Sequence, residues 1–364
     1  MARTTMTTSD NLRKEAWEEV LYRDTAKESY FMSRFGGEGL SKLEKGMGMN
    51  TTPNDVIHIK TNLEAKGATK NRKGDIITFG LVPRIDPATY PGVTSGQTLK
   101  GKEVPLSWYD FDLTLARYRQ AISAGQPMDW HRASFSIPEE ARTALKNWGV
   151  EKIDLLCFTA LGTSPTKIFY KTSSGVTSTT TAATAKTALT AADSKITPAM
   201  VSWIKTWAMT GGARTQIPIR PIRVNGKNYY VLLTHPDCIY DWTQDSTVQQ
   251  AYREAQERGN ENPLFNGASY IWDNVVIHAH ENIAVAADAG SGTDVPWAKS
   301  FLLGAQALCW AWGERPSIVE DTEDYQEDLF NAWRMTATVE KPVFNSIDYG
   351  SVCIYLSRSN VSGS

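Results

Sequence analysis

The chain has 364 residues and a formal net charge of −2, and it is 41% hydrophobic, with 12 Trp and 14 Tyr. This length and aromatic content suit one large core or two modest ones and exclude a mostly disordered chain. The near-neutral charge argues against a dedicated nucleic-acid-binding protein, which usually has a basic balance. The first twenty residues lack the apolar core of a secretory signal, and no apolar run is long enough to span a bilayer. We therefore expect a soluble protein that is made in a cytoplasm.

The four cysteines are expected to be buried free thiols. None belongs to a C-x-x-C pair, and each lies among apolar or aromatic neighbours. So few cysteines in so long a chain argue against a disulfide framework, and apolar surroundings disfavour the reactive thiolate of a catalytic cysteine. The residues concerned are Cys157, Cys238, Cys309 and Cys353.

The N-terminal part predicts a helix and then a strand. Apolar residues recur at helical spacing over residues 11–35, and the glycines of FGGEG at 35–39 can end that helix. From residue 55 onward, apolar and polar residues alternate as in a half-buried strand.

An extended hairpin is expected next. Residues 74–85 and 104–122 read as strands, and the segment between them, 86–103, is a long polar tip. A projecting hairpin buries little apolar surface of its own, so it is marginal alone and needs a support to lie on.

Residues 134–162 give the clearest helix. Ser136 and Glu139 have the spacing of a capping box, and Pro138 falls in the first turn, where its missing N–H costs nothing. We expect its apolar side to comprise Ala141, Leu145, Trp148 and Leu155.

The middle of the chain predicts mixed structure. Residues 171–195 are nearly all Thr, Ser and Ala, and we expect a surface loop or small insertion there. A helix should follow at 196–210, then a tight hairpin at 221–237 that turns at Asn225-Gly226. We expect a helix at 238–258 and two short strands around a turn at 264–280.

The C-terminal third is apolar first and acidic later. Residues 295–313 should be buried, and within them FLLGAQALCWAWG (301–313) fits a buried helix. The acidic segment 320–335 reads as a solvated helix face, without the spacing of an EF-hand calcium loop. Residues 336–357 predict two closing strands.

His278 and His280 are the strongest candidates for metal ligands. They share one face of a predicted strand, but Glu281 should point to the other face, and a zinc site needs a third ligand and a second shell. A metal-dependent enzyme that uses these two residues stays open as an alternative, although histidines at the exposed end of a strand explain the pattern more simply.

Other chemical motifs are absent or incomplete. The stretch from Gly96 to Lys102 fits G-x-x-x-x-G-K, but Glu103 occupies the place of the magnesium-binding Ser or Thr, and Pro105 prevents the required helix. No nucleophile elbow, zinc-protease or dinucleotide motif occurs. We therefore expect no enzyme activity and no cofactor.

The chain resembles the major capsid proteins of tailed bacteriophages, in particular those of N4-like short-tailed phages. The resemblance lies in four regions that follow one another in the expected order and together span most of the chain. These regions are GDIITFGLVPRI…GVTSGQTLKGKEVPLSWYDFDLTL, EEARTALKNWGVEKIDLLCFTALG, YYVLLTHPD…YREAQERGNENPLFNGASYIWDNVVIHAHENI, and SFLLGAQALCWAWG with DYGSVCIYL. The third region is the most specific, and the Thr/Ser/Ala-rich insertion at 171–195 departs from the pattern.

The resemblance implies an α+β chain with the Hong Kong 97-type capsid fold. Residues 1–60 would form the N-terminal arm, and residues 61–118 the extended loop that lies over a neighbouring subunit. Residues 119–162, with the long spine helix, and 336–364 would form the peripheral domain. Residues 163–335 would form the axial domain around the centre of a capsomer.

The function implied is that of a structural subunit in the virion. Copies would self-assemble into hexamers and pentamers of an icosahedral head that encloses double-stranded DNA, without covalent crosslinks. Further partners would be a portal protein and, where they exist, scaffolding and decoration proteins, with only weak, sequence-independent contact to DNA and none to a membrane. The subunit would be made in the bacterial host cytoplasm. A nanocompartment shell of the encapsulin type is a second alternative.

Contact residues between subunits are expected in two places. A long loop tip has little of its own chain to touch, and an amphipathic N-terminal segment can bury its apolar side against another copy. In the loop region we expect Arg84, Tyr90, Leu99, Lys100, Lys102 and Trp108; in the N-terminal segment we expect Trp17, Leu21 and Phe31.

Overall fold

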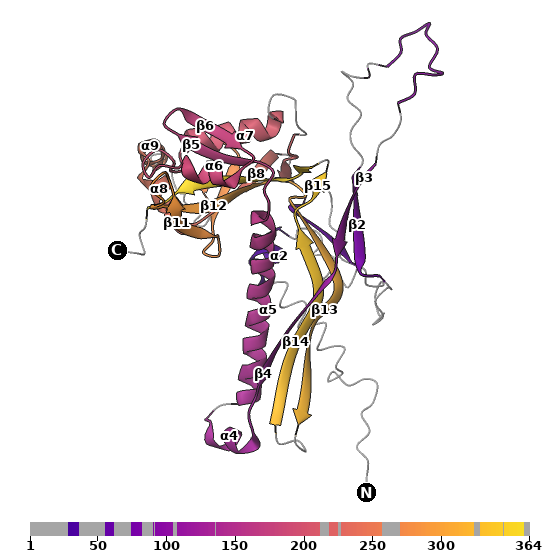
Figure 1. The fold of residues 1–364 in the computed structure, drawn as a ribbon, viewed down its shortest axis with the longest axis vertical. Helices are drawn as coiled ribbons and strands as arrows, with labels where there is room; N and C mark the ends of the chain where they lie inside the picture. The colour runs from indigo at the N-terminus through magenta and orange to yellow at the C-terminus, as the bar shows by residue number, and fades with distance from the viewer. Residues whose placement is uncertain are drawn as a thin grey trace.

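The computed structural model describes residues 28–35, 55–61, 74–81, 90, 92–104, 108–134, 136–211, 218–224, 227–256, 270–323, 328–344 and 346–359. The molecule is elongated, with a long helix beside a narrow sheet, a broader α/β lobe at one end of that helix, and a loop that projects away from both (Figure 1). No helix in these ranges is long and apolar enough to cross a membrane.

The narrow sheet has four strands in the order β1-β13-β14-β4. They are β1 (Ile57–Thr61), β13 (Leu308–Glu323), β14 (Asp328–Glu340) and β4 (Ala116–Ser123). Strands β13 and β14 form a long antiparallel hairpin, and β1 adds to β13 in parallel. Helix α5 (Ile137–Gly162) runs along this sheet, and the short α4 (Pro127–Arg132) precedes it (Figure 1).

Large aromatic side chains fill the space between α5 and the sheet. Trp310, Trp312 and Trp333 are each almost completely buried there. Gly149 of α5 lies against Trp333 so closely that an added Cβ would come within 2.8 Å of the indole ring. The glycine therefore allows the helix to approach the sheet at the tryptophan layer.

The broader lobe is built on a nine-stranded sheet with the path β6-β5-β17-β12-β8-β10-β9, in which β11 also pairs with β12 and β7 with β8. Its strands are β5 (Ile168–Thr172), β6 (Gly175–Thr179), β7 (Ile222–Val224), β8 (Lys227–Thr234), β9 (Tyr270–Trp272), β10 (Val275–Ala279), β11 (Val285–Ala289), β12 (Val295–Leu303) and β17 (Ser351–Ser357). The lobe also contains α6 (Ala182–Thr187), α7 (Pro198–Thr210), α8 (Pro236–Gln244) and α9 (Ser246–Gln256).

The two faces of this sheet join two different cores. Tyr230 and Leu232 of β8 pack in one cluster with residues of α7, whereas Val231 and Leu233 pack in the cluster that includes the inner side of α5. Side chains of a strand alternate between its faces, so a continuous apolar run such as YYVLL is what a strand covered on both faces requires. The nine-stranded sheet thus links the two parts of the molecule.

The extended hairpin consists of β2 (Ile76–Leu81) and β3 (Tyr109–Thr114), which pair antiparallel. A two-stranded ribbon, β15 (Val343–Phe344) with β16 (Ile347–Asp348), lies against β3. Beyond β2 and β3 the loop of residues 92–104 extends away from the rest of the molecule (Figure 1).

Helix α2 (Tyr30–Phe35) is fixed to α5 by a buried carboxylate. Asp154 accepts hydrogen bonds from the Ser29 hydroxyl at 2.7 Å and from the backbone N–H groups of Tyr30 and Phe31 at 2.9 and 3.0 Å. The free N–H groups of a helix start need such acceptors, and a carboxylate also suits the positive end of the helix dipole.

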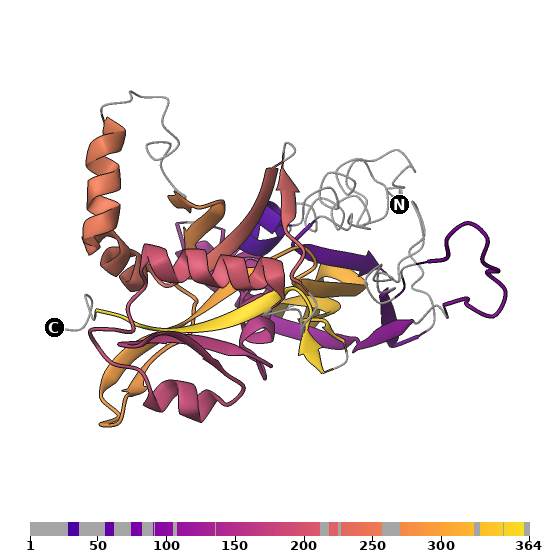
Figure 2. The same cartoon turned by 90° about the horizontal axis from the view of Figure 1, so that it is seen from above.

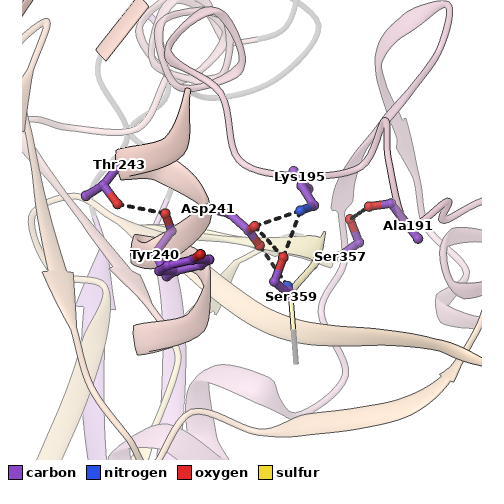
Figure 3. Close-up of polar contacts among 7 residues, drawn as sticks. All are labelled: Ala191, Lys195, Tyr240, Asp241, Thr243, Ser357 and Ser359. Atoms are coloured by element: carbon purple, nitrogen blue, oxygen red, sulfur yellow. Dashed lines mark hydrogen bonds and ion pairs between the residues drawn. The ribbon is translucent and has the colours of Figure 1, made fainter. Parts of the chain in front are cut away.

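The C-terminal segment after β17 is held by two aspartates of α8. Asp241 accepts from the Ser359 hydroxyl at 2.7 Å and pairs with the Lys195 ammonium at 2.7 Å, as Figure 3 shows. Arg358 pairs with Asp237 one helical turn away. Because both aspartates are buried, these partners compensate for the lost hydration of the carboxylates.

Most of the expected elements are confirmed. The strand after residue 55, the extended hairpin, the helices at 134–162 and 196–210, the hairpin around 225–226 and the strand pair ending in VVIHA all occur. Of the N-terminal helix at 11–35 the structure describes only its end, and the FGGEG stop after Phe35 lies outside the described residues.

Two predictions about the long helix were wrong. The Ser136 side chain makes no capping hydrogen bond, so the capping box does not form. Leu155 is 49% exposed, because the sheet contacts the side of α5 that bears Ala141 and Leu145.

Three larger expectations were also wrong. Residues 171–195 form β6, α6 and the end of β5 rather than a loop, since Ala185 and Leu189 supply enough apolar surface to anchor them. Residues 295–313 are largely buried as expected, but 301–313 form the end of β12 and the start of β13 rather than a helix, because a strand buried on both faces is as uniformly apolar as a buried helix. The acidic segment 320–335 continues the β13–β14 hairpin, whose long pairing outweighs the helical charge pattern.

Two smaller differences concern boundaries. The helix expected at 238–258 is two helices, α8 and α9, which meet at Asp245. Strand β13 and the first half of β14, expected in the axial domain, lie beside α5, whereas β17 of the C-terminal part belongs to the nine-stranded sheet.

Candidate assembly surface

The projecting loop exposes large apolar side chains at both of its ends and at its tip. Tyr90 is 48% exposed, Leu99 60% and Trp108 70%. A monomer gains nothing by keeping such side chains in water, and grouped exposed apolar residues mark interaction sites. The loop therefore offers apolar side chains for contact that the described part of its own chain leaves exposed.

Two tight turns shape the loop tip. The Gln97 N–H donates to the Thr94 carbonyl at 3.1 Å, and the Lys102 N–H donates to the Leu99 carbonyl at 3.0 Å. Gly96 and Gly101 sit in these turns with positive φ, which side chains disfavour. The turns leave Lys100 and Lys102 exposed beside Leu99, so the tip combines an apolar centre with cations.

The root of the hairpin packs on β1. The His58 and Phe79 rings are 5.0 Å apart, and the Lys60 ammonium lies 4.7 Å from the Phe79 ring centre while donating to the Thr78 carbonyl at 2.8 Å. Burial, and secondarily the Lys60 charge, lowers the pKa of His58 to about 4. The His58 ring is therefore neutral when the hairpin packs on β1.

The other side of the root is held by the β15–β16 ribbon. Phe344 of that ribbon meets Phe111 of β3, and Lys341 forms a buried ion pair with Asp348 at 2.8 Å. The Lys341 ammonium also donates to the Ser164 carbonyl at 2.8 Å, just after α5. These contacts fix the direction in which the loop leaves the molecule.

The structure separates the expected contact residues into three groups. Five of them are exposed in the loop region, namely Tyr90 and Trp108 at its ends and Leu99, Lys100 and Lys102 at its tip. The side chain of Phe31 is fully buried in its own chain, where it packs on Phe158, so its expected role at an interface was wrong. Trp17, Leu21 and Arg84 lie outside the described residues.

Phe31 is buried because α2 is short and has apolar side chains on the face toward α5. Phe31, Met32 and Phe35 all point into the core. An amphipathic pattern alone does not say whether its apolar side faces its own chain or another copy.

The two histidines pack against α2 rather than around an ion. The His280 ring lies 4.4 Å from the Tyr30 ring and 4.7 Å from the Phe158 ring, and His278 Nδ1 lies 3.4 Å from the Arg34 guanidinium. Burial, aided by Arg34, lowers the pKa of His278 to about 4. Within the described part of the chain, no three His, Cys, Asp or Glu residues are placed to hold a metal.

The four cysteines are buried free thiols, as expected. Burial raises the pKa of Cys238 and of Cys353 to about 12, so neither is a reactive thiolate at neutral pH. The role of Asp154 was not predicted from the sequence, where the available signal was a carboxylate among apolar positions of the helix. The Phe111–Phe344 contact was not predicted either, and the sequence offered no signal for it.

Comparison with known proteins identifies the family that has this architecture. Residues 5–352 match the family described as phage capsid protein. The major capsid protein of Pseudomonas phage KPP25 is 24% identical, over 95% of this chain and 96% of that protein. Among solved structures, the capsid of Ralstonia phage GP4 aligns over the whole of both chains with a TM-score of 0.72 and 24% identity. The Cyanophage Pam1 capsid covers 86% of this chain and 90% of its own, with a TM-score of 0.68 and 20% identity.

The fold is thus α+β and of the Hong Kong 97 type, with α5 as the spine helix. The subunits of such capsids assemble into oligomeric shells, and this one is a component of the phage particle. Because the family match covers nearly the whole sequence, the chain belongs to the phage capsid protein family: it is a structural protein rather than an enzyme, and a major capsid protein of a phage head.

Proposed function

We propose that copies of this chain form hexamers and pentamers of an icosahedral head around double-stranded DNA, and that each copy lays its projecting loop over a neighbouring subunit. The observation that carries this proposal is the exposure of Tyr90, Leu99 and Trp108 on a loop that extends away from its own chain. A loop of this kind becomes stable only when a second surface covers it.

The contact is between different surfaces of two copies. Head-to-tail contacts of that kind generate rings when the rotation closes. Each contact can be weak, because many of them act together in a closed shell and raise the overall stability through multivalency. Lys100 and Lys102 add charge to the apolar centre at Leu99.

The contact residues proposed are Tyr90, Leu99, Lys100, Lys102 and Trp108, together with Trp17, Leu21 and Arg84. For the domains we keep residues 1–60 as the N-terminal arm and 61–118 as the extended loop. The sheet order supports assigning β13 and β14 to the peripheral domain with α5, and β17 to the axial domain.

The remaining partners follow from the same proposal. A portal protein would be a further partner in the head, together with scaffolding and decoration proteins where they exist. The net charge of −2 supports only weak, sequence-independent contact with packaged DNA, because strong phosphate contacts would hinder movement of the DNA. The subunit would be made in the cytoplasm of a bacterial host and join neighbours without covalent bonds.

The test replaces residues 92–103 with a short Gly-Ser linker and compares the variant with the unchanged chain. Negative-stain electron microscopy and sedimentation measure the fraction in closed shells, and circular dichroism checks the fold. We expect closed shells from the unchanged chain and folded, unassembled subunits from the variant. Equal assembly by both chains would contradict the role of the loop, and an unchanged chain that stays monomeric, even with its scaffolding protein, would contradict the proposed function.

A further inference from the structure

The broader lobe, built on the nine-stranded sheet, has a strongly basic surface at one end. Residues 194–236 contain six Lys and Arg and no Asp or Glu, in a chain whose net charge is −2. Two of the six are used internally: Lys195 pairs with Asp241 (Figure 3), and Lys205 pairs with Asp273 at 2.6 Å.

Three of the remaining cations gather on the β7–β8 hairpin. Arg220, Arg223 and Lys227 are exposed, and within the described ranges their side chains form no ion pair. A groove of about 260 Å³ lies beside them, between the hairpin, the end of α7 and the β9–β10 turn. Met209 of α7 is 53% exposed at this groove, and Val224 of the hairpin is 49% exposed, so the basic surface also has apolar side chains to bury.

The opposite charge lies at the other end of the same sheet. Residues 281–298 contain no Lys or Arg, and Asp288 and Asp294 are exposed there in β11 and in the turn before β12. Asp193, which follows α6, is exposed too, and Lys186 of α6 pairs with Asp288 at 2.6 Å. The apolar member of this surface is Val285, which is 43% exposed.

Strand β12 separates the two surfaces. Its Val295 end pairs with β11, whereas Leu303 at its other end pairs with β8 near the basic hairpin. Nine residues of strand span about 30 Å. Figure 2 shows the β7–β8 hairpin and the β11–β12 turn with α6 on opposite sides of the lobe, so the two surfaces of one chain cannot meet each other.

We propose that the basic surface of one copy binds the acidic surface of the next copy around a capsomer. The basic surface comprises Arg220, Arg223, Lys227, Met209 and Val224; the acidic surface comprises Asp193, Asp288, Asp294 and Val285. The inference rests on the proposed function and adds a second contact, independent of the projecting loop. A chain with complementary ends can continue head to tail until a ring closes.

The observations favour a second copy over DNA as the occupant. DNA would require only the basic surface, whereas this chain carries a matching acidic one at the far end of the same sheet, and each surface presents exposed apolar side chains. A single exposed ion pair contributes little binding energy and is screened by salt. The apolar side chains therefore supply the buried area, while the charges set the orientation and specificity of the contact.

The test uses charge reversal and complementation in the full-length chain. One variant carries Arg223→Glu with Lys227→Glu, and a second carries Asp193→Lys with Asp294→Lys. We expect each to fold normally, because all four side chains are exposed, and to require a roughly tenfold or higher concentration to assemble. The matched control is Arg253→Glu on α9, another exposed cation, which should assemble like the unchanged chain.

An equal mixture of the two variants gives the sharpest outcome. Each variant can bind only the other on both sides, so alternating rings form, and these must have even numbers of subunits. We expect hexamers to return without pentamers, and therefore open or tubular assemblies without closed icosahedral shells. Restored complete shells or no restoration at all would overturn the inference.

Three further outcomes separate the inference from its alternatives. If both variants assemble like the unchanged chain, the surfaces are not a contact, while the proposed function stands. If Arg223→Glu with Lys227→Glu removes binding to a double-stranded DNA fragment and leaves assembly intact, the β7–β8 hairpin is a DNA-binding surface and the inference fails. If the unchanged chain never assembles, the proposed function itself fails.

Discussion

The ring of Phe111, at the root of the projecting loop, lies 6.2 Å from the ring of Phe344 in an edge-to-face arrangement. Phe344 belongs to the ribbon that the buried Lys341–Asp348 pair fixes close to the end of α5. The direction of the loop is therefore coupled to the spine helix through a short chain of buried contacts.

Phe344→Leu should loosen this coupling while keeping the site apolar. Losing the edge-to-face contact should lower the free energy of unfolding by about 0.5–1.5 kcal/mol. Because the loop direction becomes less defined, a larger share of particles should be irregular in electron micrographs. Phe330→Leu, in a half-buried position on β14, is the control and should leave particle shape unchanged.

Trp108→Ser should weaken assembly without weakening the subunit. The side chain is 70% exposed in the single chain, so its removal should change the free energy of unfolding by no more than about 0.5 kcal/mol. Sedimentation should show fewer assembled particles at a given concentration. Met128→Ser, which removes another side chain of 60% exposure outside the loop, should assemble normally, and equal loss in both variants would argue against a loop-specific contact.

Gly149→Ala should destabilise the layer between α5 and the sheet. The new Cβ would lie 2.8 Å from the Trp333 ring, which has no space to move in a packed core. We expect a loss of about 1–3 kcal/mol in chemical denaturation. Gly80→Ala is the control, because no atom lies within 4 Å of its added Cβ, and an equal loss there would refute the packing argument.

Asp154→Asn should release the start of α2. One carboxylate oxygen accepts from Ser29 and Phe31 and the other from Tyr30, so an amide must turn its NH2 group toward at least one donor. A buried donor left unsatisfied costs about 1–3 kcal/mol. Limited trypsin digestion should then cleave faster at Arg34, whereas Glu151→Gln on the exposed side of α5 should not change the rate.

Acid should loosen both histidine contacts. The pKa of His58 and that of His278 are lowered by burial from the usual 6.5 to about 4, so the folded chain holds the neutral rings. Their contribution to stability is complete above pH 6.5 and is lost as the pH falls from 6.5 through 4, because the unfolded chain gains protons first. The melting temperature should fall over this range, and His278→Gln should reduce the slope. An unchanged slope in that variant would place the acid sensitivity elsewhere.

Local patterns predicted much of this fold. Alternation revealed β1 and β10, and the turn residues 225–226 placed the β7–β8 hairpin, because these signals depend on neighbours in sequence. The helix predicted at 301–313 was wrong, since burial on both faces removes the alternation that distinguishes a strand from a helix. The helix predicted for the acidic segment 320–335 was wrong because β13 and β14 stabilise each other along their whole length.

The candidate surface was predictable in part for the same reason. A long polar tip between two strands predicts a projecting loop, and two large apolar residues stand out there, Leu99 within the tip and Trp108 just after it. By contrast, Phe31 has the same apolar character but lies in its own core, because burial depends on partners distant in sequence, here Phe158 and Asp154. The opposite charges at the two ends of β12 also emerge only when the sheet order is known.

The central claim is that neighbouring copies cover the projecting loop in a closed shell. The most direct measurement is a cryo-electron microscopy reconstruction of particles assembled from the purified chain, with its scaffolding protein if assembly requires one. We expect closed shells in which residues 92–104 lie on an adjacent subunit and Leu99 and Trp108 are buried. Shells in which this loop extends into solvent, or a chain that remains monomeric at every salt and protein concentration, would contradict it.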